Sequence, residues 1–315
     1  MSLPDVLTRM VSRLEVVATS IRSRVTIPRW VIVPVVIVLV GLSAFAWRQL
    51  PPERSPSYPA LGAVALLGVI SMAMNSVEFR VTAVLSQTTV PPLVAMRTVL
   101  AGTIANILPL PGSQLVRAGV LNSQGVPMRR ALSMSLLVGL VWIVIAVVTA
   151  MPLLAVDLPS LSVVPLMVAF SVSAVTATII AERSRRAMVT ITALVMTECS
   201  LVFFQIARLL LIGHALGTEI DLSGSAALAV AATIATGAAL LPSGLGLREG
   251  LSVLVGPLGG IGRAESLVMS VFDQAIAYGT IAVVAVVLTT LRFRPREYFS
   301  DVSAAETSQD TGSAT

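Results

Sequence analysis

Long apolar runs recur along nearly the whole chain, and they constrain its fold more than any other feature. The first begins at Trp30, and others, each about one bilayer long, follow as far as residue 291. A helix needs about 20 predominantly apolar residues to cross the hydrocarbon core of a membrane. Helices also satisfy their own backbone hydrogen bonds, which lipid cannot do for them. The sequence therefore predicts an all-α fold, a polytopic bundle of transmembrane helices.

Composition agrees with this prediction. Of the 315 residues, 56% are hydrophobic and 12% are charged, and the mean hydropathy is +0.92. Soluble domains have about 25% charged residues, so a chain this apolar could not cover its surface with polar groups. The net charge of +5 comes from Arg residues in short clusters between the apolar runs. This distribution is typical of membrane proteins and gives no reason to expect a nucleic-acid partner.

The chain divides into three parts. Residues 1–29 have apolar residues at helical spacing with Arg between them, which predicts an amphipathic helix on the membrane surface. Residues 30–292 form the membrane domain, and residues 293–315 are polar and predict a disordered tail. We expect seven or eight membrane segments, at about residues 30–47, 58–77, 91–108, 131–151, 162–181, 188–213, 223–241 and 266–291.

The loop charges fix the orientation only in part. Five Arg precede residue 30, so the N-terminus is expected in the cytoplasm, with the protein in the inner or plasma membrane. If the segment 91–108 is re-entrant, the Arg residues after 291 fall on the outer side. If it spans the membrane, the basic run 182–186 falls there instead. The side of the C-terminus therefore stays open.

Several kinds of active site are excluded by single residues. Cys199 and His214 are the only residues of their types, so the chain has no intrachain disulfide, Cys-rich metal site or His pair. It contains no Lys and hence no Walker motif. No paired carboxylates with suitable spacing stand out. We expect no catalytic residues, no metal and no cofactor.

Two Pro/Gly interruptions in apolar sequence resemble each other. A Thr lies six residues before a Pro in each, and one or more Gly and then an Arg follow. The central prolines, Pro109 and Pro242, are 133 residues apart, nearly half the chain. The break residues are Pro109, Pro111 and Gly112 in the first interruption, and Pro242, Gly244 and Gly246 in the second. The pattern predicts an internal repeat with a broken helix at the same place in each half.

Such breaks point to a binding site. Pro removes a backbone donor and Gly allows unusual backbone conformations, so the freed polar groups must face protein or a water-filled cavity. A helix N-terminus beside Arg117 or Arg248 would attract an anion. We expect these two Arg to meet in one cavity, with Glu249 and Asp273 balancing their charge. The alternative is that both interruptions are surface loops whose Arg mark cytoplasmic loop edges.

The same residues carry a family resemblance. The stretch 106–121 and the later stretch 241–249 resemble the membrane domain of lysylphosphatidylglycerol synthases and related flippase-like proteins, over about residues 30 to 292. The second motif is the more specific, because all its Pro, Gly, Arg and Glu positions fit. The first has Gln114 where the family usually has an acidic residue, and the span 134–148 lacks the family's charged residues.

The resemblance implies a membrane domain that moves or accommodates a phospholipid head group. The expected head-group residues are Asn106, Gln114, Arg117, Arg248, Glu249 and Asp273. The leading hypothesis is a flippase-like transporter of a lipid or lipid-linked substrate, with membrane lipids as its partners. The alternatives are an enzyme of lipid or glycan assembly, and a membrane subunit that works with a separately encoded transferase. A homo-oligomer is also compatible with the sequence.

Ionisable residues inside apolar segments are costly and mark functional candidates. Glu198 lies in the middle of the segment 188–213, so it needs a polar partner or a proton. Asp273 is expected either to pair with Arg248 or Arg117 or to stay near the interface. Arg208 lies towards a helix end and is expected to reach the interface, and Glu78 is expected at the interface as well.

Overall fold

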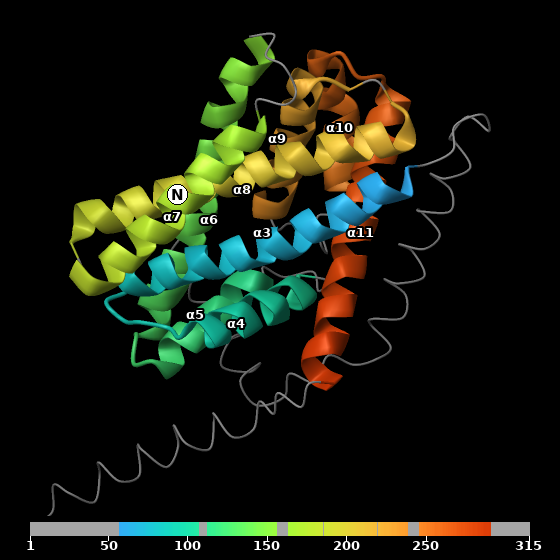
Figure 1. Ribbon diagram of the computed structural model, residues 1–315. Helices are drawn as coiled ribbons and strands as arrows, with labels where there is room; N and C mark the ends of the chain where they lie inside the picture. Colours follow the sequence, from blue (N-terminus) through green and yellow to red (C-terminus); the bar gives the residue numbers. More distant parts are fainter. Residues whose placement is uncertain are drawn as a thin grey trace, which may run out of the picture.

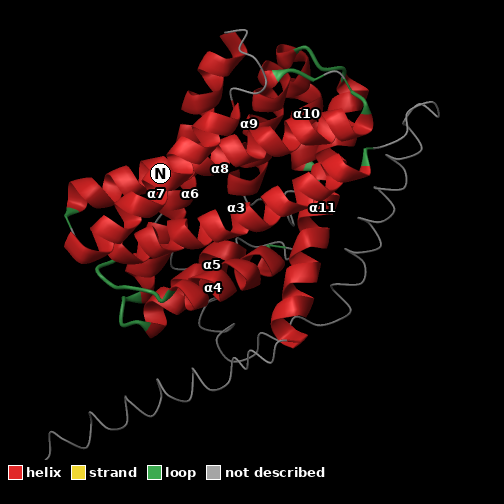
Figure 2. Ribbon diagram, viewed as in Figure 1, coloured by secondary structure: helices red, strands yellow, loops and turns green. Residues whose placement is uncertain are grey.

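The computed structural model describes residues 57–106, 112–155, 163–184, 186–218, 220–238 and 246–290. These ranges contain nine α-helices, one short 3-10 helix and no strand, which confirms the predicted all-α fold (Figure 2). The expected surface helix at 1–29, the first expected span at 30–47 and the polar tail at 293–315 lie outside the described residues.

The helices are α3 (Tyr58–Leu85), α4 (Pro92–Ala105), α5 (Gly112–Ser123), α6 (Met128–Ala155), α7 (Val163–Ser184), α8 (Ala187–Leu216), α9 (Leu222–Ala238), α10 (Leu247–Val255), the 3-10 helix η3 (Gly256–Gly259) and α11 (Arg263–Thr290). Five of them, α3, α6, α7, α8 and α11, are long and apolar enough to cross a membrane. On this ground the chain is a multi-pass membrane protein.

Two apolar helices are shorter. α4 has 14 residues, and at 1.5 Å per residue it is about 21 Å long, less than the roughly 30 Å of a bilayer core. α5 packs against α4 after the first break. The segment expected at 91–108 is therefore not one straight span but the first arm of a helical hairpin. α9 has 17 residues and is followed in the same way by α10, which packs against it.

The core forms where α8 meets its neighbours. α8 is buried on most of its surface, with Ile206, Leu209 and Ile212 almost fully inside. It packs against α3 and α7, and α3 and α8 run side by side in opposite directions (Figure 1). In contrast, the apolar residues Leu140 and Val148 of α6 point outward. An outward apolar face of this kind suits contact with lipid.

The helix order is the same around both breaks. In each half a long helix, a short helix, the break, another short helix and a long helix follow one another: α3, α4, α5 and α6, then α8, α9, α10 and α11. The last long helix of each half packs against the other half: α6 contacts α8 and α9, and α11 contacts α3 and α4. α6 and α11 also run in opposite directions (Figure 1). This arrangement agrees with the predicted repeat.

Glycines allow both short helices to start where they do. A Cβ on Gly112 would lie 2.2 Å from the carbonyl oxygen of Ala105, so only Gly lets the start of α5 approach the end of α4 this closely. Gly246 has a φ of +81° immediately before α10, which side chains disfavour. The predicted break residues Pro109, Pro111, Pro242 and Gly244 lie outside the described residues.

Candidate functional site

A polar cavity of about 250 Å³ lies between the two halves of the fold. Its lining comes from α3, α4, α5, α6, α8, α9 and α11, so both breaks have a helix next to it. A larger groove of about 740 Å³ lies between α3, α7 and α8 and is lined mainly by Ala, Val and Leu. We regard the smaller cavity as the candidate site, because charged and hydrogen-bonding side chains converge there.

Polar side chains reach the cavity from one face of α3 and one face of α8. Ser71, Asn75 and Glu78 follow at steps of four and three residues on α3, and Gln205 and Arg208 are three residues apart on α8. Residues three or four apart lie on the same face of a helix. The sequence of each long helix thus presents a polar stripe to the cavity within an otherwise apolar span.

Arg117 of α5 forms a two-point ion pair with Glu78 of α3. Its Nη1 and Nη2 donate to Oε1 and Oε2 of Glu78 at 2.5 and 2.9 Å. Both side chains are largely buried, and the guanidinium carbon lies 5.9 Å from the centre of the Phe79 ring. A planar guanidinium matches a carboxylate in this geometry, which makes the pair both strong and well oriented.

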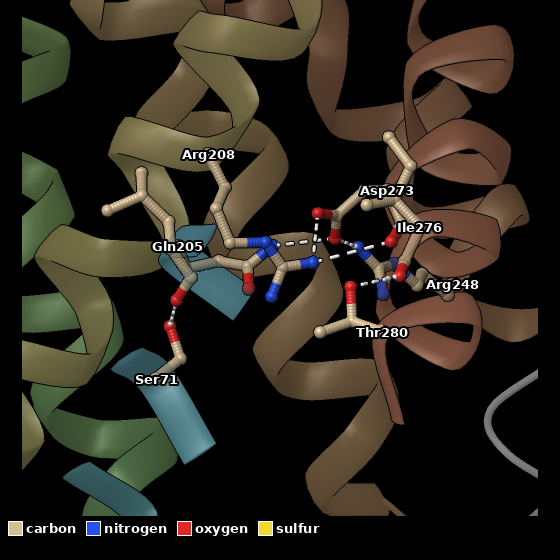
Figure 3. Close-up of polar contacts among 8 residues, drawn as sticks. Ser71, Gln205, Arg208, Arg248, Asp273, Ile276 and Thr280 are labelled. Carbon is tan, nitrogen blue, oxygen red and sulfur yellow. Dashed lines mark hydrogen bonds and ion pairs between the residues drawn. The ribbon is translucent and has the colours of Figure 1, made fainter. Parts of the chain in front are cut away.

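A second cluster forms around Asp273 of α11, which is completely buried. Figure 3 shows Arg208 of α8 and Arg248 of α10 pointing towards its carboxylate, and each forms an ion pair with it. Gln205 Nε2 also donates to Asp273 Oδ2 at 2.9 Å. One carboxylate is therefore shared by two guanidinium groups, which leaves this cluster with a net positive charge.

The two clusters occupy related places in the two halves. Glu78 and Arg117 join α3 to α5, the short helix after the first break. Arg208 and Arg248 join α8 to α10, the short helix after the second break, through Asp273. Each half therefore holds its short post-break helix to its own first long helix by buried charges.

Three N–H groups of residues that line the cavity lack an acceptor. Arg117 Nε, Arg208 Nε and Trp142 Nε1 are buried and donate to no residue that the structure describes. Most buried donors in proteins are paired, so unpaired ones need an explanation. Arg117, Arg208 and Trp142 all line the same cavity, so the three unpaired donors belong to one site.

No protein-family model, curated protein or solved structure matches this chain. The site must therefore be interpreted from its own geometry. Within the described ranges, no three His, Cys, Asp or Glu side chains come together as a metal ion would require.

Three residues predicted for the head-group site, Asn106, Gln114 and Arg117, line the cavity, whereas Arg248, Glu249 and Asp273 do not. The prediction that Arg117 and Arg248 both line one cavity is therefore wrong. Asn106 also has a structural contact, because its Oδ1 accepts a hydrogen bond of 2.7 Å from the backbone N–H of Ser113. It thereby connects the end of α4 to the start of α5 across the first break. Gln114 lies in the first turn of α5 and faces Gly139 of α6.

The predicted charge balance is right for one arginine and wrong for the other. Asp273 does pair with Arg248, as expected. Arg117, however, pairs with Glu78 and not with Glu249 or Asp273. Glu249 Oε2 instead accepts a hydrogen bond of 2.7 Å from the backbone N–H of Gly246. Three residues after Gly246, it caps the start of α10, where the exposed backbone donors attract a carboxylate.

Two central residues, Glu78 and Arg208, were expected at the interface and are in fact buried, at 5% and 8% exposure. α3 continues to Leu85 and α8 to Leu216, so neither residue lies at the end of its helix. Gln205 lies seven residues after Glu198, and Arg208 lies three residues after Gln205. This spacing puts all three on one face of α8 and could have indicated that Arg208 faces inward.

Glu198 lies inside the bundle, with an exposure of 1%, so the prediction that it avoids lipid is confirmed. The expected hydrogen-bonding partner is not found, since neither carboxylate oxygen accepts a hydrogen bond from any described residue. Glu78 and Arg117 are the charged groups that act on it electrostatically. Leu201 and Gln205, three and seven residues further along the same face of α8, line the cavity.

Proposed function

We propose that this protein is a flippase-like lipid transporter that binds the anionic head group of a phospholipid or lipid-linked substrate in the central cavity. The observation that carries the proposal is the set of buried, unpaired donors on Arg117, Arg208 and Trp142. The oxygens of a phosphate diester would accept from these groups, and a guanidinium can bind two such oxygens at once.

The charge of the site supports an anion. We define the central charge cluster as Glu78, Arg117, Arg208, Arg248 and Asp273. The first three line the cavity, Asp273 pairs with Arg208, and Arg248 pairs with Asp273. Three guanidinium groups against two carboxylates leave one positive charge. Burying an unbalanced charge is costly, so a ligand with one negative charge is favoured in this cavity.

The size of the cavity limits the substrate. At about 250 Å³ it is slightly smaller than the roughly 300–1,000 Å³ of sites for drug-sized ligands. A phosphate with a small polar group fits a space of this size, whereas a long oligosaccharide does not. The acyl or isoprenoid chains would remain in the surrounding lipid while the head group passes.

The helix order supports a transporter with two opposed halves. If each hairpin, α4 with α5 and α9 with α10, returns to the side of the membrane from which it enters, α3 and α8 cross the membrane in opposite directions. The halves then form an inverted repeat, and substrate sites in such folds lie at the repeat interface. With the segment 30–47 this gives eight membrane segments, with the N-terminus in the cytoplasm and the chain in the plasma or inner membrane.

The experiment is lipid translocation in reconstituted vesicles. Purified protein is placed in liposomes that contain fluorescent phosphatidylglycerol, and a membrane-impermeant reductant reports how fast the inner-leaflet label reaches the outside. Wild-type protein should speed this transfer relative to protein-free vesicles, and Arg208→Gln should remove most of the gain.

The matched control is Arg183→Gln, which makes the same change at an exposed position near the end of α7. It should translocate lipid as the wild type does. Fluorescent phosphatidylcholine, which has no net charge, should be a poorer substrate. Equal transfer by wild type, Arg208→Gln and protein-free vesicles would rule out the proposed function.

A further inference from the structure

We infer that Glu198 is a proton-binding site coupled to anion binding in the central cavity, so that a proton and an anionic head group occupy the protein together. The inference rests on the proposed function and adds the ion that drives it. Glu198 is 1% exposed, and neither of its carboxylate oxygens accepts a hydrogen bond from a described residue. A buried carboxylate with no donor is costly, and a bound proton removes that cost.

A switch between two acceptors is built into the surroundings of Glu198. Arg117 uses both terminal nitrogens for Glu78, and its Nε is buried without an acceptor. Both oxygens of Glu198 lack a donor, and Arg117 lies close enough to act on its charge. Arg117 therefore has an unpaired donor, Glu198 has an unpaired carboxyl, and both interact with Glu78. When Glu198 carries a proton, Arg117 pairs with Glu78 alone. When Glu198 loses the proton, its carboxylate becomes a second possible partner for Arg117.

Among the described residues, the other charged groups on α8 and on the helices that pack against it are paired or exposed. The helices that pack against α8 are α3, α6, α7, α9 and α11, and α5 brings Arg117. Glu182 of α7 pairs with Arg80 at 2.6 Å, and Asp273 of α11 holds two arginines. The ionisable groups at the ends of these helices are exposed: Arg129, Arg130, Arg183, Arg186, His214, Asp221, Arg263 and Glu265. α9 has no ionisable residue.

The charge count gives the direction of coupling. With Glu198 protonated, the central charge cluster has one excess positive charge, which an anionic head group neutralises. With Glu198 ionised, three carboxylates balance three guanidinium groups and the head group would add an uncompensated charge. Protonation therefore favours anion binding, and by linkage the bound anion favours protonation to the same extent. In the overall step one proton from water binds a Glu198 oxygen as one anion enters, and both leave on the other side.

The test is calorimetric titration of dihexanoyl phosphatidylglycerol into the purified full-length protein, in two buffers with different ionisation enthalpies. The difference between the buffers reports the number of protons taken up with the lipid. We expect close to one proton for the wild type near the pH where Glu198 titrates, and an affinity that falls about tenfold or more as the pH rises through that range.

Glu198→Gln imitates the protonated acid, so it should bind the lipid with proton uptake near zero and with an affinity that no longer depends on pH. Glu198→Met has a similar volume without polar atoms and should give the same result if the Gln variant is unstable. Glu182→Gln, the same change at the carboxylate of the half-buried Arg80 pair, should behave as the wild type.

The outcomes separate the two proposals. Lipid binding with equal proton uptake in wild type and Glu198→Gln would overturn the proton site and leave the transporter proposal standing. Absence of lipid binding at every pH would overturn the transporter proposal and the coupling with it. Infrared spectra of the lipid-free protein then test whether Glu198 is protonated without lipid. A carboxylic-acid C=O band that disappears in Glu198→Gln supports a proton on Glu198, and an unchanged spectrum contradicts it.

Discussion

Glu78 and Arg117 lie 39 positions apart in the sequence and form a buried two-point ion pair, with N–O distances of 2.5 and 2.9 Å. The pair connects α3 with α5, which begins after the first Pro/Gly break. Its two charged groups also act electrostatically on the unpaired Glu198. One contact thus joins the helix packing, the cavity lining and the proposed proton site.

Removing one partner of this pair should destabilise the protein strongly. Glu78→Gln leaves Arg117 buried without its counter-ion, and breaking a buried pair from one side costs about 3–5 kcal/mol. Thermal or denaturant unfolding in detergent micelles measures the loss. Glu182→Gln breaks the more exposed pair with Arg80 and should cost about 0–1 kcal/mol. Similar losses for the two variants would contradict the central place given to Glu78.

Asp273→Asn should be more harmful than Glu78→Gln. Asp273 is fully buried and neutralises both Arg208 and Arg248, so its loss leaves two guanidinium groups to repel each other. We expect the largest drop in melting temperature among the single carboxylate variants, or failure to accumulate in the membrane. Gln205→Leu removes only the hydrogen bond to Asp273 and should cost about 0.5–1.5 kcal/mol.

Two glycines of the same short helix should respond in opposite ways to alanine. Gly112→Ala places a Cβ 2.2 Å from the carbonyl oxygen of Ala105, so the hairpin of α4 and α5 must open. Gly119 has nothing within 4 Å of the added carbon, so Gly119→Ala should stabilise α5 by up to about 1 kcal/mol. Unfolding free energies of the two variants check this, and equal effects would mean that the break is not tightly packed.

Trp142→Phe should weaken ligand binding without unfolding the protein. The change keeps an aromatic ring and removes Nε1, the unpaired donor of a residue that lines the cavity. A neutral hydrogen bond contributes about 0.5–1.5 kcal/mol, so affinity for a short-chain anionic phospholipid should fall by roughly two- to tenfold. The melting temperature of the lipid-free protein should stay unchanged. Unaltered affinity would place the head group away from Trp142.

Opposite orientation of the two halves can be tested by cysteine labelling. In a background of Cys199→Ser, Thr89→Cys marks the connection between α3 and α4, and Thr218→Cys marks the one between α8 and α9. If the repeat is inverted, an impermeant maleimide should reach these two sites from opposite sides of the membrane. Labelling of both from the same side would mean that one hairpin crosses the membrane.

The apolar runs by themselves determined the fold class and most helix positions. A long apolar segment in lipid forms a helix, because the helix satisfies the backbone hydrogen bonds that lipid cannot provide. The recurrence around Pro109 and Pro242 likewise predicted matching helix orders, and Gly112 and Gly246 do lie where the short helices begin. These are local properties, and a sequence pattern carries them directly.

Only the tertiary structure decided which charges meet. The sequence showed that Arg117 and Arg248 lie beside the breaks. It did not show that Arg117 pairs with Glu78, or that Arg208 and Arg248 share Asp273. Helical spacing shows which face a charge lies on, whereas its partner depends on how helices far apart in the chain rotate and pack. For the same reason Glu198 was predicted to have a partner and has none among the described residues, since only packing determines whether a donor comes within reach.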